Sequence, residues 1–162
     1  MTDRVIFDAE RMKYPHTGLY HFCKQLGLAL LKNKGLHSTI DLQFYLSDIT
    51  SKTFGDKVHY IKQKSIDKFL HLFLPNSQLW QSNYQVSSYL PSNSKIKVVA
   101  TIHDLNFFKE GKSLVKEGKY LTKLQNNLDR AECVVAISEY VKRDLLAHCN
   151  LNGKEIYTIY NG

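Results

Sequence analysis

Residues 96–105 read Ile-Lys-Val-Val-Ala-Thr-Ile-His-Asp-Leu, and their first seven residues form the strongest strand pattern in the chain. This run is almost continuously apolar and rich in β-branched side chains, which is typical of a strand buried on both faces of a parallel sheet. It passes without a break into His103 and Asp104. A buried strand that ends on polar residues predicts an α/β fold and a candidate site at the end of the strand.

The same pattern recurs on both sides of this strand. Further apolar runs of strand length are found at residues 5–7, 40–46, 58–61, 78–81, 133–137 and 156–160. Segments that predict helices begin at Gly18 and Ser113 and span Ser65–Leu74 and Glu139–His148, and Ser113 is a candidate N-cap of its helix. The segment 87–94 is rich in Ser, Asn and Pro and predicts a surface loop. We therefore expect one domain over residues 1–162, a Rossmann-like parallel sheet with helices on both faces.

The balance of charged residues is basic. Lys and Arg number 22 against 15 Asp and Glu, a formal net charge of +7. This charge suits an anionic partner, such as a nucleic acid, an acidic membrane surface or a phosphorylated substrate, or else it belongs to an ordinary solvated surface. The basic residues are spread along the chain instead of gathering in one block. That spread argues against nucleic acid as the partner.

Cysteine and histidine spacings indicate neither a metal site nor a disulfide framework. The three cysteines, Cys23, Cys133 and Cys149, form no CxxC pair, and the seven histidines show no HxH or HxxxH spacing. We expect reduced cysteines in a cytoplasmic protein and no bound metal or cofactor. No apolar run of about 18 residues is present, so we expect no membrane span, only contact of the basic surface with the inner membrane.

Polar residues follow four of the predicted strands, at the edge where doubly wound sheets bind ligands. Gly18, before the first helix, lets backbone N–H groups approach a phosphate, or it is an ordinary loop glycine. Asn83 lies in the turn after the strand at 78–81. His103 donates a hydrogen bond to a sugar hydroxyl or moves a proton, or it is a structural histidine bonded to a loop carbonyl.

Two further residues at this edge have a simple structural interpretation. Asp104 either orients His103 or caps the turn that follows, and capping is the favoured role. Ser138 is well placed to cap the helix that begins at Glu139, and it also lies where a ligand would reach it. Both are candidate substrate-binding residues, together with Gly18 and Asn83, and His103 is the candidate catalytic residue.

Several phrases of the sequence resemble glycosyltransferase family 4. They are Val98–Leu105, Arg130-Ala131, Val134–Leu145 and Ile159–Gly162 in the second half, and Phe7–Arg11 and Thr17–Tyr20 near the start. The resemblance implies a GT-B fold, in which two Rossmann-like domains face a cleft. It implies that residues 1–162 are the amino-terminal, acceptor-side domain. The donor-binding domain is then missing from this chain, and the chain alone is expected to be inactive.

The resemblance also implies a reaction. The family transfers sugars from nucleotide-sugar donors to glycan or lipid-linked acceptors, typically with retention and without a bound metal. It places Gly18 at the donor phosphates, His103 at the transferred sugar and Ser138 along the cleft. Surface polysaccharide or lipopolysaccharide synthesis is the expected pathway.

Other functions remain open from the residues. The first is a non-catalytic Rossmann-like module that binds a nucleotide or a protein, and the second is a basic nucleic-acid-binding domain. The third is a sugar-nucleotide epimerase, which shares the GT-B fold. The Ile-His-Asp and Ile-Ser-Glu-Tyr phrases favour the transferase over the epimerase.

Overall fold

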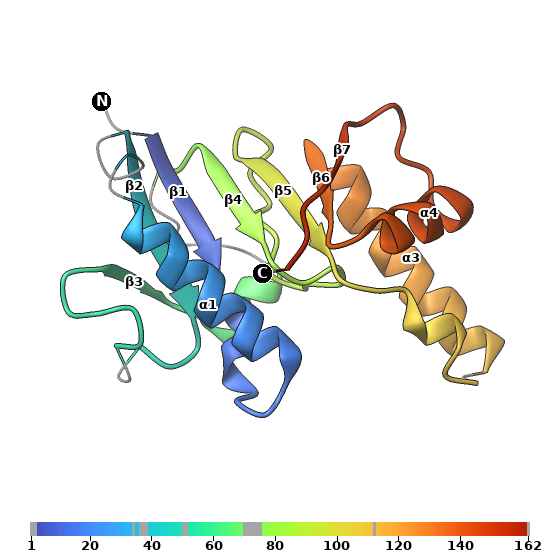
Figure 1. The fold of residues 1–162 in the computed structure, drawn as a ribbon, viewed down its shortest axis with the longest axis horizontal. Helices are drawn as coiled ribbons and strands as arrows, with labels where there is room; N and C mark the ends of the chain where they lie inside the picture. Colours follow the sequence, from blue (N-terminus) through green and yellow to red (C-terminus); the bar gives the residue numbers. More distant parts are fainter. Residues whose placement is uncertain are drawn as a thin grey trace.

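The computed structural model describes residues 3–33, 35, 39–49, 52–69, 76–111 and 113–161. Within these residues, parallel strands form one sheet in the order β3-β2-β1-β4-β5-β6-β7 (Figure 1). The strands are β1 (Asp3–Asp8), β2 (Ile40–Leu46), β3 (His59–Lys62), β4 (Leu79–Ser82), β5 (Lys97–Ile102), β6 (Cys133–Ala136) and β7 (Ile156–Thr158). The first six strands follow the Rossmann order, so the expected fold is confirmed.

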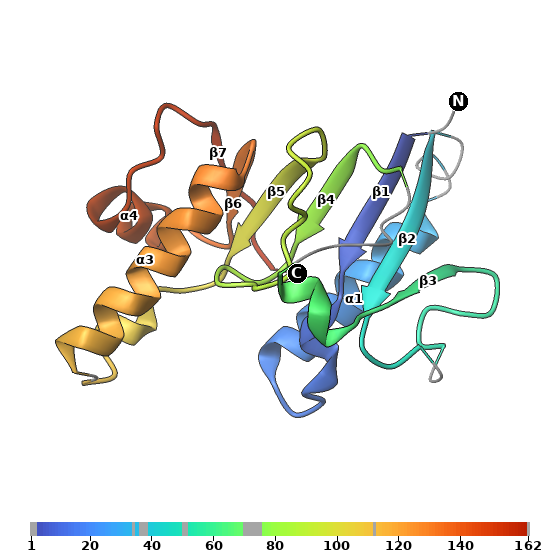
Figure 2. The same cartoon turned by 180° about the vertical axis from the view of Figure 1, so that it is seen from behind.

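Helices lie on both faces of the sheet. Figure 1 shows α1 (Gly18–Lys32) in front of β1 and β2, and Figure 2 shows α3 (Leu114–Arg130) in front of β6 from the opposite side. The described residues also include α4 (Glu139–His148) and the 3-10 turns η1 (Glu10–Lys13), η2 (Ser65–Lys68) and η3 (Asn106–Phe108). This arrangement follows from right-handed crossovers, because the strand order reverses at β1 and the connections then cross the opposite face.

The alternation of side chains along the strands builds two hydrophobic clusters. Phe7 and Phe44 point toward α1, where Cys23 and Phe54 complete one cluster. On the other face, the buried side chains of β1, β4, β5 and β6 pack with those of α3 and α4, among them Ile6, Trp80, Val98, Ile102, Leu124, Leu128, Val134 and Leu145. Burial on both faces explains the unbroken apolar runs of the central strands.

Helix α1 approaches the sheet closely at Gly27. A Cβ atom at this position would lie 2.4 Å from Cε1 of Phe54 and 3.0 Å from Cε1 of Phe44. These two rings stack with their centroids 4.0 Å apart. The missing side chain of Gly27 therefore lets α1 rest on an aromatic layer, which fixes where the first turn of the helix meets the end of β1.

Three local expectations need correction. The helix expected from Ser65 to Leu74 is a single 3-10 turn, η2, up to Lys68, and residues 70–74 lie outside the described residues. Ser113 occupies the N-cap position of α3, but its side chain makes no capping hydrogen bond. The strand expected at 156–160 ends at Thr158.

The loop at 87–94 is only partly on the surface. Ser87 and Tyr89 are buried, since α3 holds this segment against the sheet. The amide of Asn127 donates to the carbonyl oxygens of Gln85 and Ser87, at 3.1 and 3.0 Å. The guanidinium of Arg130 donates to three further carbonyls, those of Pro91, Asn93 and Ile96. Local composition did not reveal these long-range hydrogen bonds.

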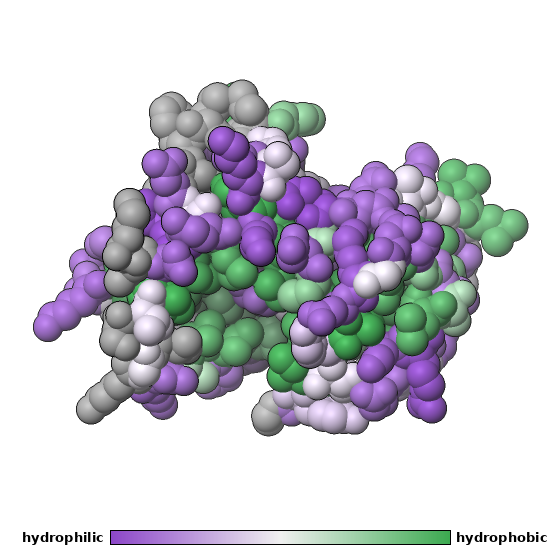
Figure 3. Space-filling model, turned by 90° about the horizontal axis from the view of Figure 1, so that it is seen from above, coloured by the Kyte–Doolittle hydropathy of each residue, from purple (hydrophilic) through white to green (hydrophobic). Residues whose placement is uncertain are grey.

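Apart from β3, the strands begin at the upper edge in Figure 1, and Figure 3 shows the molecule from that side. Apolar surface gathers there in a central hollow between polar rims. None of the described helices is long and apolar enough to cross a membrane. All three cysteines are free, and Cys23 is fully buried, as expected for a small apolar residue.

Candidate functional site

His103 lies directly after β5, at the edge of the sheet where the strands end. Its Nε2 lies 3.1 Å from the backbone carbonyl oxygen of Asn83, which follows the neighbouring strand β4. A carbonyl oxygen only accepts hydrogen bonds, so Nε2 carries the proton and donates it. The ring also meets Phe22 of α1 edge to face, with centroids 4.5 Å apart. A backbone carbonyl of the turn after β4 and a side chain of α1 therefore meet at this histidine, the residue after β5.

The remaining ring nitrogen of His103 is left to accept a hydrogen bond. Burial lowers the pKa of His103 below its ordinary value of 6.5, although the hydrogen bond to Asn83 and the charge of Asp104 act in the opposite direction. The imidazole is therefore neutral at pH 7. Among the described residues, Nδ1 has no hydrogen-bond partner. A neutral imidazole with a free Nδ1 accepts a hydrogen bond from a hydroxyl group.

We predict that ¹H–¹⁵N NMR of the chain finds His103 as the Nε2–H tautomer, with a pKa below 6.5. Because burial is the main cause, the Phe22→Ala variant, which exposes the ring, moves this pKa upward. A proton on Nδ1 in the neutral form, or a pKa above 6.5, would contradict the geometry described for the ring.

Two amide side chains hold the turns around His103. Gln85 accepts from the backbone N–H of His103 at 3.4 Å and donates to the carbonyl oxygen of Asp104 at 3.1 Å. Asn83 is 1% exposed, and its amide donates to the carbonyl oxygen of Asp8 at 2.8 Å. The buried amide of Asn83 therefore joins the ends of β1 and β4. That Asn83 binds substrate stays a prediction.

Asp104 and Ser138 both act as caps. The Asp104 carboxylate accepts from the backbone N–H of Asn106 at 3.0 Å, and this hydrogen bond closes the turn into η3. Ser138 Oγ accepts from the backbone N–H of Val141 at 3.2 Å, at the start of α4. The capping roles expected for both residues are confirmed. A contact of either residue with substrate stays a prediction.

Helix α1 points its amino terminus at the same edge of the sheet. Thr17 caps it, and its Oγ1 accepts from the backbone N–H of Tyr20 at 3.2 Å. The backbone N–H groups of Gly18 and Leu19 have no acceptor among the described residues. Gly18 is exposed, and a Cβ atom there would meet nothing within 4 Å. An anion can approach these N–H groups, where the helix dipole favours negative charge.

Sequence patterns did not single out a buried pair of carboxyl groups, Asp8 and Glu10, at the end of β1. Asp8 accepts from the backbone N–H of Glu10 at 3.0 Å, and Ser87 Oγ lies 3.4 Å from its other oxygen. Burial raises the pKa of Asp8 to about 7, and the charge of Glu10 adds to this effect. Glu10 is 4% exposed and pairs with Lys13. Two acidic residues directly after a buried strand were the available signal for this pair.

Arg11 completes this side of the edge. Its guanidinium carbon lies 4.2 Å from the ring centroid of Tyr84 and 4.6 Å from that of Tyr14. Its Nη1 lies 4.0 Å from a carboxylate oxygen of Glu10. The Nε atom is buried and has no hydrogen-bond partner within the described part of the chain. Arg11 is therefore a cation held in position by two aromatic rings, and its Nε–H remains available to donate a hydrogen bond.

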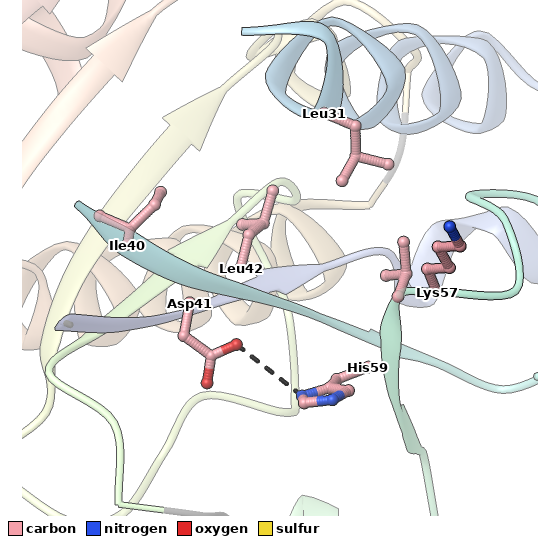
Figure 4. A pocket seen from close by; sticks show the side chains of 7 residues that line it. Leu31, Ile40, Asp41, Leu42, Lys57 and His59 are labelled. Carbon is pink, nitrogen blue, oxygen red and sulfur yellow. Dashed lines mark ion pairs between the residues drawn. The ribbon is translucent and has the colours of Figure 1, made fainter. Parts of the chain in front are cut away.

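A cavity of about 370 Å³ lies at the opposite edge of the sheet, where β2 and β3 begin. Figure 4 shows Asp41 and His59, two of the residues that line it, pointing toward one another, with Nδ1 of His59 3.8 Å from the carboxylate. Asp41 already accepts from Arg4 Nε at 2.8 Å, and His59 is largely exposed. This cavity is remote from the polar groups at the strand ends, so it is not the candidate site.

No group of three or more His, Cys, Asp and Glu side chains with metal-binding geometry occurs among the described residues. A family model described as Glycosyltransferase Family 4 matches residues 67–162. The matched region includes His103, Asp104 and Ser138 together with the strands that carry them. None of the curated proteins matches the chain.

Proposed function

The chain belongs to glycosyltransferase family 4, and from this premise we propose that it is the acceptor-side domain of a two-domain enzyme that transfers a sugar from a nucleotide-sugar donor. The acceptor is a glycan or a lipid-linked molecule, transfer proceeds with retention, and no metal or other cofactor is bound. One observation carries the proposal: His103, the start of α1 and the start of α4 gather at the edge where parallel sheets bind ligands.

His103 is the residue that we assign to the transferred sugar. Its Nε2–H is committed to the carbonyl of Asn83, so the ring is held in one orientation. A sugar hydroxyl then donates to Nδ1, which has no other partner within the described residues. The contact positions the sugar ring near the reaction centre. A neutral imidazole suits this task, since an imidazolium could only donate.

The first turn of α1 is assigned to the donor phosphates. A nucleotide diphosphate leaving group gains negative charge in the transition state, and free backbone N–H groups stabilise that charge. Gly18 and Leu19 supply two such groups. Because the helix is anchored by Gly27 against the aromatic layer, these groups keep their position as charge develops.

The second domain of the enzyme supplies most contacts to the nucleotide, so residues 1–162 alone are inactive in this proposal. The net charge of +7 suits an anionic acceptor at the inner surface of the membrane. Three free cysteines suit the cytoplasm. Synthesis of surface polysaccharide or lipopolysaccharide is the pathway that we propose.

Substitution of Gly18 tests the assignment of the phosphates. In the enzyme that carries both domains, we expect Gly18→Ala to raise the KM for the nucleotide sugar about tenfold, because the added methyl group keeps the phosphate from the backbone N–H groups. The fold should be unaffected, since the new Cβ meets nothing within 4 Å. Steady-state kinetics with a labelled nucleotide sugar measures the effect.

Gly118→Ala is the matched control, as this helical glycine also has open space around it. It should leave KM unchanged and stabilise α3 slightly. An unchanged KM in Gly18→Ala would refute the assignment of α1 to the phosphates. It would leave the proposed transferase activity unaffected. If the two-domain enzyme turned over no nucleotide sugar with any glycan or lipid-linked acceptor, the proposed function itself would fail.

A further inference from the structure

Three lysine side chains from different elements converge on Tyr89 and Ser88. The Nζ atoms of Lys13 (η1) and Lys68 (η2) each lie 5.8 Å from the ring centroid of Tyr89. Lys123 (α3) donates to Ser88 Oγ at 2.5 Å. Lys13, Lys68 and Lys123 are named here the lysine cluster. They are separated by 55 residues or more in the sequence, so only the fold brings them together.

The positive charge of the lysine cluster is not balanced by carboxylates. Glu10 is the only acidic group described in contact with it, through its pair with Lys13. Partial desolvation lowers the pKa of Lys123 although the residue as a whole is exposed, and the charge of Lys68 lowers it further, while Glu10 acts in the opposite direction. Asp67, next to Lys68, is turned inward, where it accepts from the hydroxyl of Tyr45 at 2.9 Å. Three ammonium groups thus share one carboxylate.

Mutual repulsion of this kind is relieved when an anion binds between the charges. The hydrogen-bond donors here are of two kinds, the ammonium groups of the lysine cluster and the hydroxyl of Ser88. Together they suit the several oxygens of a phosphate group. Ile66 in η2 and Phe69 directly after it lie near Lys68 in the chain, and they are 50% and 85% exposed. An apolar group attached to the phosphate therefore has apolar surface beside it.

We propose that the lysine cluster binds a phosphate monoester or diphosphate group of the acceptor. The identity of that group as part of an acceptor rests on the proposed function. The binding site itself does not, because it is made of this chain alone. It is made of other residues than the start of α1, which is assigned to the donor phosphates, because its lysines come from η1, η2 and α3.

The test is a binding titration of the chain with inorganic pyrophosphate, followed by ¹H–¹⁵N NMR and calorimetry. We expect Lys68→Gln and Lys123→Gln each to weaken binding about tenfold, the effect of one lost charge-assisted hydrogen bond. Lys119→Gln is the matched control, because it removes the same charge from an exposed position of the same helix α3. Both test residues are exposed, so their variants should fold.

A second arm identifies the source of the phosphate. Phosphatidylcholine vesicles containing phosphatidic acid present a phosphate monoester, and vesicles containing phosphatidylglycerol present only a diester. If the chain prefers vesicles with phosphatidic acid and Lys68→Gln abolishes this preference, the result supports a lipid-linked acceptor. Binding of pyrophosphate without binding of vesicles supports a soluble acceptor. The proposed site would be overturned if Lys119→Gln weakened pyrophosphate binding as much as the test variants do, or if the chain did not bind pyrophosphate. Equal binding to both kinds of vesicle without pyrophosphate binding would overturn it as well.

The outcome is independent of catalysis. The titration contains no donor sugar, so an inactive enzyme that still binds pyrophosphate through Lys68 and Lys123 would keep the anion site and lose the transferase proposal. An active enzyme whose chain does not bind pyrophosphate would keep the transferase proposal and lose the anion site.

Discussion

Replacing His103 with alanine lowers kcat about a hundredfold or more in the two-domain enzyme, while the domain remains folded. A decrease in kcat of this size is expected when one positioning or proton-transfer contact in the transition state is lost. Nδ1 is the group whose loss matters, because Nε2–H is already used to hold the ring on the carbonyl of Asn83. Steady-state kinetics of sugar transfer measures kcat, and circular dichroism follows the fold.

Two further variants separate a role at the substrate from a structural one. In His103→Gln, the amide nitrogen can donate to the Asn83 carbonyl and the amide oxygen can accept a hydroxyl, so activity should be partly restored. His59→Ala, at the opposite edge of the sheet, should retain full kcat. Full activity in His103→Ala would refute the role assigned here. A fall in melting temperature large enough to account for the lost activity would instead indicate a structural histidine.

Asp8→Asn makes the domain more stable at pH 8 and leaves its stability nearly unchanged at pH 4. The pKa of Asp8 rises from 3.8 to about 7 on folding, because the carboxyl group is fully buried. Between these values the folded state holds a proton that the unfolded state has released, so the free energy of unfolding falls as pH rises from about 4 to 7. The full effect is at most roughly 4 kcal/mol.

The asparagine side chain reproduces the neutral form of the carboxyl group. Its oxygen can accept from the N–H of Glu10 and its amide can donate to Ser87 Oγ, the two contacts that Asp8 makes. Urea unfolding of wild-type and variant chains at several pH values measures the difference. Titration of groups that do not interact with Asp8, His103 included, cancels in that difference.

Asp56→Asn serves as the control, since this aspartate is 79% exposed at its side chain. It should change the free energy of unfolding by less than about 0.5 kcal/mol at every pH. If Asp8→Asn were instead destabilising at pH 8, the folded protein would stabilise the ionised carboxylate of Asp8, and the burial penalty described for it would be wrong.

The central elements of the fold were readable from local patterns. The helix expected at residues 139–148 is α4 with the same bounds, and the strand expected at 96–102 is β5 from Lys97. Such segments are predictable because a strand buried on both faces must be apolar throughout, and a half-buried helix must repeat its apolar positions. Ser138 was likewise predictable as a cap, because capping depends on one side chain and a backbone group three residues away.

Expectations failed where contacts from distant segments override local preference. The segment at 87–94 has the composition of a surface loop, yet Asn127 and Arg130 bind its backbone carbonyls and bury its first half. Residues 65–68 form a single 3-10 turn in place of the start of a longer helix, and within it Asp67 turns inward to Tyr45. Composition over a short window contains no information on such partners.

The sequence was enough to establish the α/β fold class, the family resemblance and the position of His103 after a buried strand, since each depends on neighbours in the chain. It was not enough to find the buried Asp8, the tautomer of His103 or the lysine cluster. Each of these depends on charge and burial contributed by residues up to about a hundred positions away, and electrostatic interactions follow distance in space, not in sequence. Only the folded chain sets those distances.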